Sequence, residues 1–375
     1  MAKYKKRPDG RYQANICIGY DSSKKRKFKT VYGRSIAELE RNKSEILADL
    51  ARGTYSDDEG YTLGTYAKEW LEAYKSDLSA STYQGYRNII TNHFSGIQDI
   101  RLKDLKKTDI QAGMNVIEGY DLKRRYRLTL NQILETAIDD GLIYKNVSRG
   151  IQLPKASRRG KRALTEEEKK ALFKAKLTPK EKAFVCVLYY AGLRRGEALA
   201  LTRADINLNS GTITVNKSLE FIGNSSGAKS PKTSAGNREV PLIEPLGTVL
   251  KSYMQYQRNL VLFPNSSGQY MSGTSYKRFW NQIYRKINEA AGGTHHWEGS
   301  KVVFDINAIQ GLTPHIFRHN YATMLYYAGV DLKEAIRILG HADSKTTLDI
   351  YTHLDQNKSN CGLKLQEYMA AQKSD

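Results

Sequence analysis

The longest apolar stretch of this 375-residue chain is "AFVCVLYYAGL" at residues 183–193. It is too short to cross a bilayer, so it predicts a helix buried in the core of a folded domain. The sequence continues as "RRGEALAL", which predicts that the helix breaks at Ala191-Gly192 and restarts at Arg194. The restart places a guanidinium beside N–H groups that have no partner within the helix, and such a place suits an anion.

The overall charge favours a polyanionic partner. The chain has 59 Lys and Arg against 39 Asp and Glu, a net charge of +20, and its pI is near 9.6. A hydrophobic content of 40% over this length allows two or three domains, each with its own core. Nucleic acid is the first polyanion to consider, and a generally basic protein without such a partner is the alternative.

The cysteines and the first residues exclude several classes. Cys17, Cys186 and Cys361 lie far apart without CxxC spacing, so we expect neither a disulfide framework nor a metal site. The opening "MAKYKKRPDG" leads into polar residues without an apolar signal region. We therefore expect a cytoplasmic protein with no membrane partner.

The first 55 residues predict a small basic domain, a three-stranded sheet plus a helix. Residues 11–20 and 26–33 read as strands, and a helix over 35–53 has Ile36, Leu39, Ile46 and Leu50 at helical spacing. Residues 1–35 hold eleven Lys and Arg against two Asp. A basic sheet can enter a DNA groove, although a solvated hairpin would have the same composition. The candidate DNA contacts are Lys5, Lys6, Arg7, Arg11, Lys25, Arg26 and Lys27.

A helical bundle is predicted over residues 62–148, where four segments with helical periodicity begin at Ser, Thr or Asp. Basic residues flank Tyr126 in the last of them, and this grouping suits contacts with a DNA backbone. They are Lys123, Arg124, Arg125 and Arg127. A basic stretch with Pro and Gly at 153–168 reads as a linker to a third domain, residues 160–375.

The third domain concentrates chemically useful side chains. Strands at 211–217 and 238–242 are joined by a flexible Ser/Gly hairpin that carries Lys229 and Lys232. A helix capped by Thr313 and begun by Pro314 should present His315 and Arg318 on one face. A further helix is stopped by Gly340, which leaves His341 just beyond its end, and Tyr351 follows ten residues later.

This region has no cluster of carboxylates for magnesium and no Walker lysine motif. Two arginines, a lysine, two histidines and a tyrosine can instead act on a phosphodiester without metal, ATP or other cofactor. Guanidinium groups would stabilise the pentacoordinate phosphate, and a side-chain hydroxyl would conserve the bond energy in a covalent phosphotyrosine.

Several segments in the same order resemble the tyrosine recombinases, the lambda-type phage and conjugative-transposon integrases. They are "GLRRGEALAL", "PKTSAGNREVPL", "TPHIFRHNYAT" and "ILGHADSKTTLDIYTHL". Residues 1–55 also resemble the arm-type DNA-binding domain of these integrases, and residues 62–148 resemble their helical, SAM-like core-binding domain. The resemblance implies a mainly helical multidomain fold with a mixed α+β catalytic domain that contains a small antiparallel sheet.

The resemblance also implies a role for each residue. Arg194 and Arg318 would clamp the scissile phosphate, Lys232 would protonate the leaving 5′-oxygen, and His315 would assist proton transfer. His341 would bind a non-bridging oxygen, and Tyr351 would attack to leave a 3′-phosphotyrosine. Lys229 is the less favoured lysine, and His319 matches a supporting position.

The partners implied are double-stranded DNA with core and arm-type attachment sites, a homotetramer on synapsed DNA, and an accessory DNA-bending or excision factor. Integration and excision of a mobile element would proceed through a Holliday junction. Beyond Tyr351, an apolar stripe at helical spacing predicts a tail helix that docks on a neighbouring protomer. The stripe consists of Cys361, Leu365, Tyr368 and Met369.

Two other functions use the same features. A type IB topoisomerase would relax supercoils with the same constellation, although the arm-like N-terminal region argues against it. A non-catalytic architectural DNA-binding protein would need only the basic surfaces, and the complete set from Arg194 to Tyr351 argues against that reading.

Overall fold

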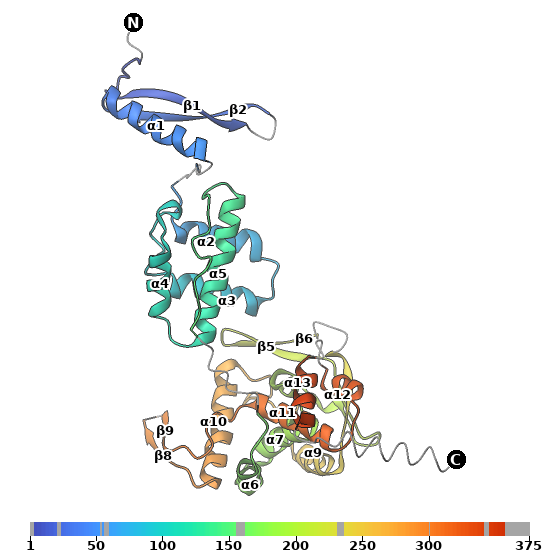
Figure 1. Cartoon of the computed structure of the whole chain (residues 1–375). Coiled ribbons are helices and arrows are strands. Elements are labelled where there is room, and N and C mark those ends of the chain that lie inside the picture. Colours follow the sequence, from blue (N-terminus) through green and yellow to red (C-terminus); the bar gives the residue numbers. More distant parts are fainter. Residues whose placement is uncertain are drawn as a thin grey trace. The chain divides into compact units, whose positions relative to one another are not determined.

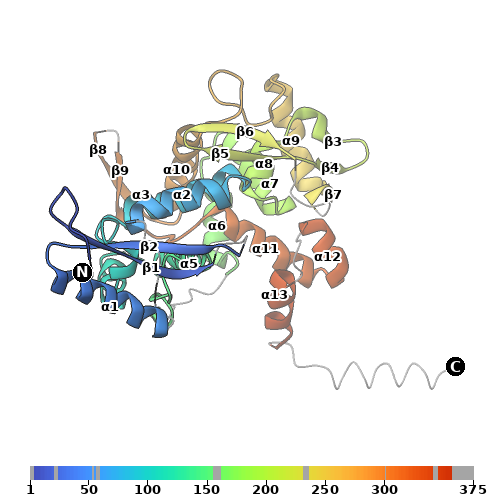
Figure 2. The same ribbon diagram turned by 90° about the horizontal axis from the view of Figure 1, so that it is seen from above.

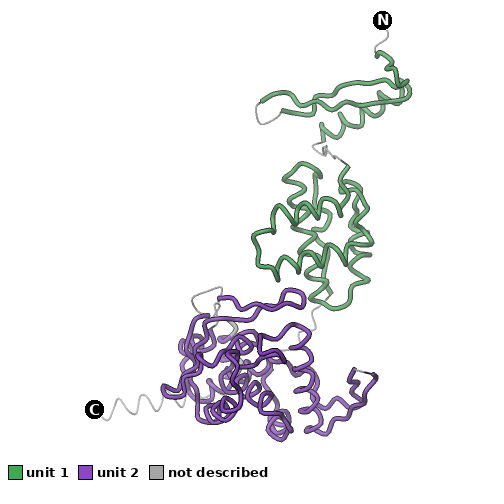
Figure 3. Tube along the Cα trace, turned by 180° about the vertical axis from the view of Figure 1, so that it is seen from behind, with its two compact units in different colours: residues 1–158 green, residues 159–375 purple. Residues whose placement is uncertain are grey.

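The computed structural model describes residues 4–20, 24–52, 55, 60–154, 162–230, 236–299, 301–340 and 345–356. The chain divides into two compact units, residues 1–158 and 159–375 (Figure 3). Most of the described elements are helices, and the strands form small antiparallel sheets (Figure 1). The fold class expected from the sequence is confirmed. None of the helices in the described ranges has the length and apolar character that a membrane span requires.

The first unit begins with a β-hairpin and a helix. Strands β1 (Tyr12–Tyr20) and β2 (Arg26–Gly33) pair antiparallel, and α1 (Ile36–Arg52) covers one face of the hairpin (Figure 1). A small core forms between them from Ile16, Val31 and Leu39. The alternation of the strands places these residues toward the helix, so the opposite face of the hairpin carries polar and aromatic side chains.

Two expectations about this region are wrong. Within residues 4–52 the sheet has two strands and not three: the preceding segment makes only an isolated bridge between Lys6 and Tyr12. Pro8, which has no N–H to donate, lies in the tight turn that follows Lys6. Ile36 was expected at helical spacing with Leu39 on the apolar face of α1, but it lies at the start of the helix and is exposed.

The remaining described part of the first unit is a helical bundle with its own core. Helices α2, α3, α4 and α5 surround Trp70, Phe94 and Tyr126, which are buried. A reciprocal Thr62–Thr65 capping box begins α2. The elements are α2 (Leu63–Lys75), α3 (Ala80–His93), η1 (Leu102–Asp104), α4 (Lys107–Asn115) and α5 (Tyr120–Asp139).

The second unit is a mixed α and β domain. Its strands form one three-stranded sheet, β3-β4-β7, and two hairpins, β5-β6 and β8-β9. The strands are β3 (Ile206–Asn207), β4 (Thr212–Val215), β5 (Ser218–Ile222), β6 (Ser225–Lys229), β7 (Arg238–Pro241), β8 (Thr294–Glu298) and β9 (Lys301–Ile306). The helices are α6 (Glu166–Lys174), α7 (Pro179–Ala191), α8 (Arg195–Ala200), η2 (Arg203–Asp205), α9 (Glu244–Tyr256), α10 (Gly273–Ala290), α11 (Pro314–Tyr327), α12 (Leu332–Leu339) and α13 (Lys345–Gln356).

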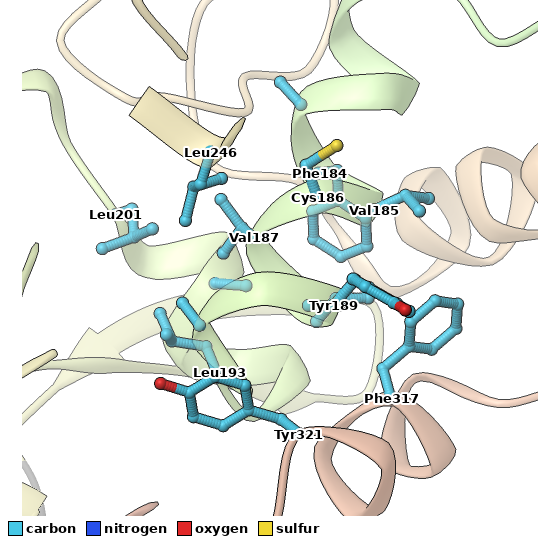
Figure 4. Close-up of a cluster of buried hydrophobic side chains, with 14 of the residues drawn as sticks. Phe184, Val185, Cys186, Val187, Tyr189, Leu193, Leu201, Leu246, Phe317 and Tyr321 are labelled. Carbon is cyan, nitrogen blue, oxygen red and sulfur yellow. The ribbon is translucent and has the colours of Figure 1, made fainter. Parts of the chain in front are cut away.

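Helix α7 lies at the centre of this unit, as the apolar run predicts. Phe184, Val187 and Leu188 are fully buried, and Phe317 and Tyr321 of α11 contribute to the same core (Figure 4). Helix α7 therefore fixes α11 against the start of α8. Helices α11, α12 and α13 contact one another and lie together in both views (Figures 1 and 2).

The segment between β4 and β7 was expected to contain a flexible Ser/Gly hairpin that carries Lys229 and Lys232. In the described part of this segment, β5 and β6 form an antiparallel hairpin in which Ser218 pairs with Lys229. Lys229 ends strand β6, and its ammonium lies 2.7 Å from a carboxylate oxygen of Glu220. Lys232 and the tail stripe from Cys361 to Met369 lie outside the described residues.

Candidate active site

Arg194 lies at the break between α7 and α8. Helix α7 ends at Ala191, and Gly192 adopts a left-handed conformation with φ of 61°. A Cβ at Gly192 would lie 2.3 Å from Cδ1 of Tyr321, so both the turn and the packing of α11 require glycine. Arg194 then begins α8, and its backbone N–H donates to Oε2 of Glu197 at 2.9 Å. Its side chain stays 38% exposed, so its guanidinium is open to solvent.

Arg318 approaches the same break from α11. As predicted, Thr313 stands at the N-cap position of this helix and Pro314 occupies its first turn, although the Thr313 side chain makes no capping hydrogen bond. The side chain of Arg318 is only 2% exposed, and it donates to the carbonyl of Gly192 at 3.0 Å and to that of Leu339. A buried guanidinium held by two carbonyl groups has a fixed orientation.

The carbonyl end of α12 brings three arginines together. The backbone N–H of Gly340 donates to the carbonyls of Ile336 and Arg337. The carbonyl groups of the next three residues, at the end of the helix, can accept hydrogen bonds from side chains. Each receives one guanidinium: Arg238 donates to Ile338 at 2.6 Å, Arg318 to Leu339, and Arg194 to Gly340 at 2.7 Å. These cations also suit the negative end of the helix dipole.

Glu197 is the carboxylate that joins this cluster. It makes ion pairs with Arg194 at 2.7 Å and with Arg238 at 2.8 Å, and its side chain is 7% exposed. Burial alone would raise the pKa of Glu197, but the bond from Arg238 and the charges of Arg194 and Arg318 lower it to about 2. Glu197 is therefore ionised at neutral pH.

The positive charges in the cluster exceed the negative charge of Glu197. Burial and repulsion by Arg194 lower the pKa of Arg318 to about 9, and Glu197 only partly offsets them. Three guanidinium groups against one carboxylate leave two positive charges among these described residues. An anion bound beside Arg194 and Arg318 would relieve this repulsion.

A groove opens beside the exposed part of the cluster. It has a volume of about 440 Å³, and its lining includes Arg194, Arg195, Ser218 and His315. His315 is exposed on the first turn of α11, and its ring packs edge-on against that of the buried His319 at 4.8 Å between centroids. The groove thus offers a guanidinium and an imidazole to one ligand, which suits a tetrahedral oxyanion.

Tyr351 lies in α13 and is 8% exposed. Its hydroxyl donates to the carbonyl of Val330 at 3.2 Å, and its ring packs edge-on against Tyr326. Burial raises the pKa of Tyr351 above its ordinary value, and the carboxylate of Asp331 contributes a smaller share. The hydroxyl is therefore protonated at neutral pH and held by a backbone carbonyl.

The predicted site residues thus fall into three groups. The structure brings Arg194, Arg318 and His315 together, and it places Tyr351 on the adjoining α13. Lys232 and His341 lie outside the described residues. Among the described residues no group of three or more His, Cys, Asp or Glu side chains could hold a metal ion.

Sequence reasoning missed Glu197 and Arg238. Glu197 lies three residues after Arg194, the spacing of a capping box, which could have indicated it. Arg238 and Val240 alternate along "REVPL" and so share the buried face of β7, which could have indicated a buried arginine.

The predicted DNA contacts in the hairpin region are all exposed: Lys5, Lys6, Arg7, Arg11, Lys25, Arg26 and Lys27. The guanidiniums of Arg7 and Arg11 lie over the ring of Tyr32, at 5.3 and 4.8 Å from its centroid. In the bundle, Arg124 and Arg125 are exposed and Lys123 is half-buried. Arg127 donates to the carbonyl of Ile151 at 2.9 Å, so it also holds the end of the bundle.

Comparison with known proteins gives relatives that match over most of the chain. The tyrosine recombinase XerC-like protein of Caldanaerobacter subterraneus subsp. tengcongensis is 27% identical over 93% of this chain and 94% of its own length. The ICEBs1 integrase of Bacillus subtilis is 25% identical over 94% and 96%. Tyrosine recombinase XerD of Proteus mirabilis is 30% identical over 76% and 85%.

Solved structures show the same fold. The Tn1549 transposon integrase in complex with transposon right end DNA matches with a TM-score of 0.64 and 21% identity, over 77% of this chain and 94% of that one. A lambda integrase tetramer bound to a Holliday junction matches with a TM-score of 0.57 and 19% identity, over 93% and 94%.

Two family models match the two units separately. The phage integrase N-terminal SAM-like domain matches residues 62–116, and the phage integrase family matches residues 162–358, which is more than half of the chain. The second match contains Arg194, His315, Arg318 and Tyr351. The chain therefore belongs to the phage integrase family, the tyrosine recombinases that cleave and rejoin DNA.

Proposed function

We propose that this tyrosine recombinase is the integrase of a mobile genetic element, and that it integrates and excises the element by cutting and rejoining DNA at attachment sites. The observation that carries the proposal is the grouping of cationic side chains: Arg194 and His315 line one groove, and Arg194 and Arg318 donate to neighbouring carbonyls at the end of α12. A phosphodiester carries the negative charge that suits such a site and has the geometry that guanidinium groups bind with paired hydrogen bonds. The similarity to the ICEBs1 integrase supports a mobile element as the source of the DNA.

The reaction begins with the scissile phosphate in the groove. Arg194 and Arg318 bind its non-bridging oxygens and stabilise the charge that develops in the pentacoordinate transition state. Two carbonyl groups already fix the side chain of Arg318, so this side chain loses little conformational freedom when DNA binds. Arg194 is the more exposed of the two and exchanges the carbonyl of Gly340 for a phosphate oxygen.

Proton transfers accompany the attack. Tyr351 is the nucleophile, and its hydroxyl leaves the carbonyl of Val330 to form a 3′-phosphotyrosine. His315 assists removal of the hydroxyl proton, with His319 packed behind its ring. Lys232 protonates the leaving 5′-oxygen, and His341 binds a non-bridging oxygen. The reverse attack by a 5′-hydroxyl of the partner strand rejoins the DNA.

Binding of the DNA outside the groove uses the other basic surfaces. The hairpin domain, residues 1–55, binds arm-type sites through its exposed Lys and Arg residues. The bundle, residues 62–148, binds core sites, with Lys123, Arg124, Arg125 and Arg127 near the backbone. The protein works in the cytoplasm, where four copies on synapsed DNA exchange strands through a Holliday junction with an accessory DNA-bending or excision factor.

Covalent trapping tests the proposal. DNA carrying the element's junction sequence, with a nick that lets the released fragment diffuse away, should accumulate a protein–DNA adduct. Tyr351→Phe should form no adduct yet bind the DNA with nearly unchanged affinity, because it removes one hydroxyl from a large electrostatic interface. Tyr326→Phe is the matched control: it removes the hydroxyl of the tyrosine whose ring packs against Tyr351, and it should still form the adduct. An adduct from Tyr351→Phe would show that another residue is the nucleophile.

A further inference from the structure

Arg238 is a buried arginine for which the proposed reaction has no role. Its side chain is 3% exposed, and it lies at the start of β7. It binds two other elements at once: two nitrogens reach both carboxylate oxygens of Glu197 in α8, at 2.8 and 3.2 Å, and Nε donates to Ile338 in α12 at 2.6 Å. The planar guanidinium of arginine has several N–H donors in a fixed arrangement, and the ammonium of lysine cannot hold these acceptors in the same way.

Glu197 has two cationic partners that differ in burial. Arg238 is enclosed, whereas Arg194 is 38% exposed beside the groove. When a phosphate binds Arg194, it competes with Glu197 and with the carbonyl of Gly340 for the guanidinium. A buried carboxylate left without a cation would resist that exchange, because an uncompensated charge in the interior is costly.

The geometry points to Arg238 as a positioning residue for DNA cleavage. It keeps Glu197 paired and the carbonyl end of α12 in place, so that Arg194 can exchange its internal acceptors for the scissile phosphate. This inference rests on the proposed function, since it takes Arg194 to bind that phosphate. Arg238 touches no reacting atom and acts through Arg194.

Arg238 also joins the start of β7 to the last turn of α12, because its Nε donates to the carbonyl of Ile338 at 2.6 Å. This contact holds the end of α12, where the carbonyl of Gly340 accepts from Arg194 at 2.7 Å. A misplacement of about 1 Å at a reacting group can cost about 100-fold in rate.

The test measures single-turnover cleavage of the nicked substrate at saturating protein, together with DNA affinity by fluorescence anisotropy. Arg238→Met should slow cleavage about 100-fold, as expected for a misplaced reacting group, while the affinity stays within about twofold. Lys286→Met is the control: it breaks another ion pair, between the half-buried Lys286 and the buried Glu181 at the far end of α7, and should cleave near the parent rate below its melting temperature.

A double variant separates positioning from general stability. If Arg238 acts through Arg194, Arg194→Ala with Arg238→Met should cleave no more slowly than Arg194→Ala alone, whereas independent effects would multiply. A loss of cleavage rate in the double variant equal to the product of the two single losses would overturn the inference, and so would a loss in Lys286→Met as large as that in Arg238→Met.

If Arg238→Met fails to fold, Arg238→Lys is the second variant: it keeps the positive charge but lacks the paired N–H donors of the guanidinium. Cleavage by Arg238→Lys at the rate of the parent protein would also overturn the inference. A parent protein that forms no adduct would refute the proposed function, and this inference with it.

Discussion

At the scale of single residues, the cluster around Glu197 makes stability depend on pH. The pKa of Glu197 is lowered from an ordinary 4.5 to about 2 in the folded chain. A lowered carboxyl pKa stabilises the fold above pH 4.5, and the contribution disappears as the pH falls toward 2. A shift of this size corresponds to roughly 3 kcal/mol at neutral pH.

We therefore expect Glu197→Gln to unfold at lower urea concentration than the parent at pH 7, with a difference that shrinks between pH 4.5 and 3. Chemical denaturation followed by circular dichroism over this pH range measures the difference. Glu239→Gln removes an exposed carboxylate next to Arg238 and should follow the parent throughout. A deficit of constant size down to pH 3 would show that Glu197 is not held ionised by its arginines.

The choice between two lysines is also decided at this scale. Lys232→Ala should slow cleavage of ordinary DNA, and a 5′-bridging phosphorothiolate, whose leaving group needs no proton, should restore much of the rate. Lys229→Ala is the matched control, because Lys229 is engaged with Glu220 at the end of β6. If the phosphorothiolate substrate restored the rate of Lys229→Ala and not that of Lys232→Ala, Lys229 would be the residue that protonates the leaving oxygen.

At the scale of elements, the break between α7 and α8 depends on one glycine. Gly192→Ala should destabilise the catalytic unit by about 2 kcal/mol or more, since left-handed backbone costs a residue with a Cβ about 1–2 kcal/mol and this Cβ would strike Tyr321. Gly247→Ala in α9 is the control: its Cβ meets no atom closer than 3.8 Å, and it should be neutral or slightly stabilising. Thermal unfolding measures both, and an unaltered melting temperature for Gly192→Ala would contradict the structural account.

The sequence predicted those elements whose signals are local. Strands β1 and β2, the buried α7 and the start of α11 at Thr313-Pro314 all agree with expectation, because alternation, apolar runs and helix-start residues act within a few residues. Within the Ser/Gly hairpin, strand β6 was not predicted, because "SSGAK" has the composition of a loop and becomes a strand only by pairing with β5. Arg238 was missed for the same reason: its acceptors lie 41 and 100 residues away.

At the scale of the whole molecule, the hairpin domain and the catalytic unit have separate hydrophobic cores. Removing residues 1–55 should therefore leave cleavage at core sites intact and weaken binding to arm sites. For every phosphate that the shortened protein no longer neutralises, the slope of log affinity against log salt should fall by roughly 0.9 for duplex DNA. Footprinting and salt titrations measure both effects. An unchanged footprint on arm sites and an unchanged slope would remove the basis for an arm-binding role.

The order of the functional residues along the chain has a consequence for synthesis of the protein. Arg194 is translated well before Tyr351, and the basic hairpin and the bundle precede both. Domains fold as units during synthesis, with N-terminal ones first, and the ribosome needs on the order of ten seconds to extend from Arg194 to Tyr351. If Tyr351 is the nucleophile, as proposed, a nascent chain can bind DNA before it can cut it. An interrupted translation product that ends before α13 would then occupy the proposed attachment sites without breaking the chromosome.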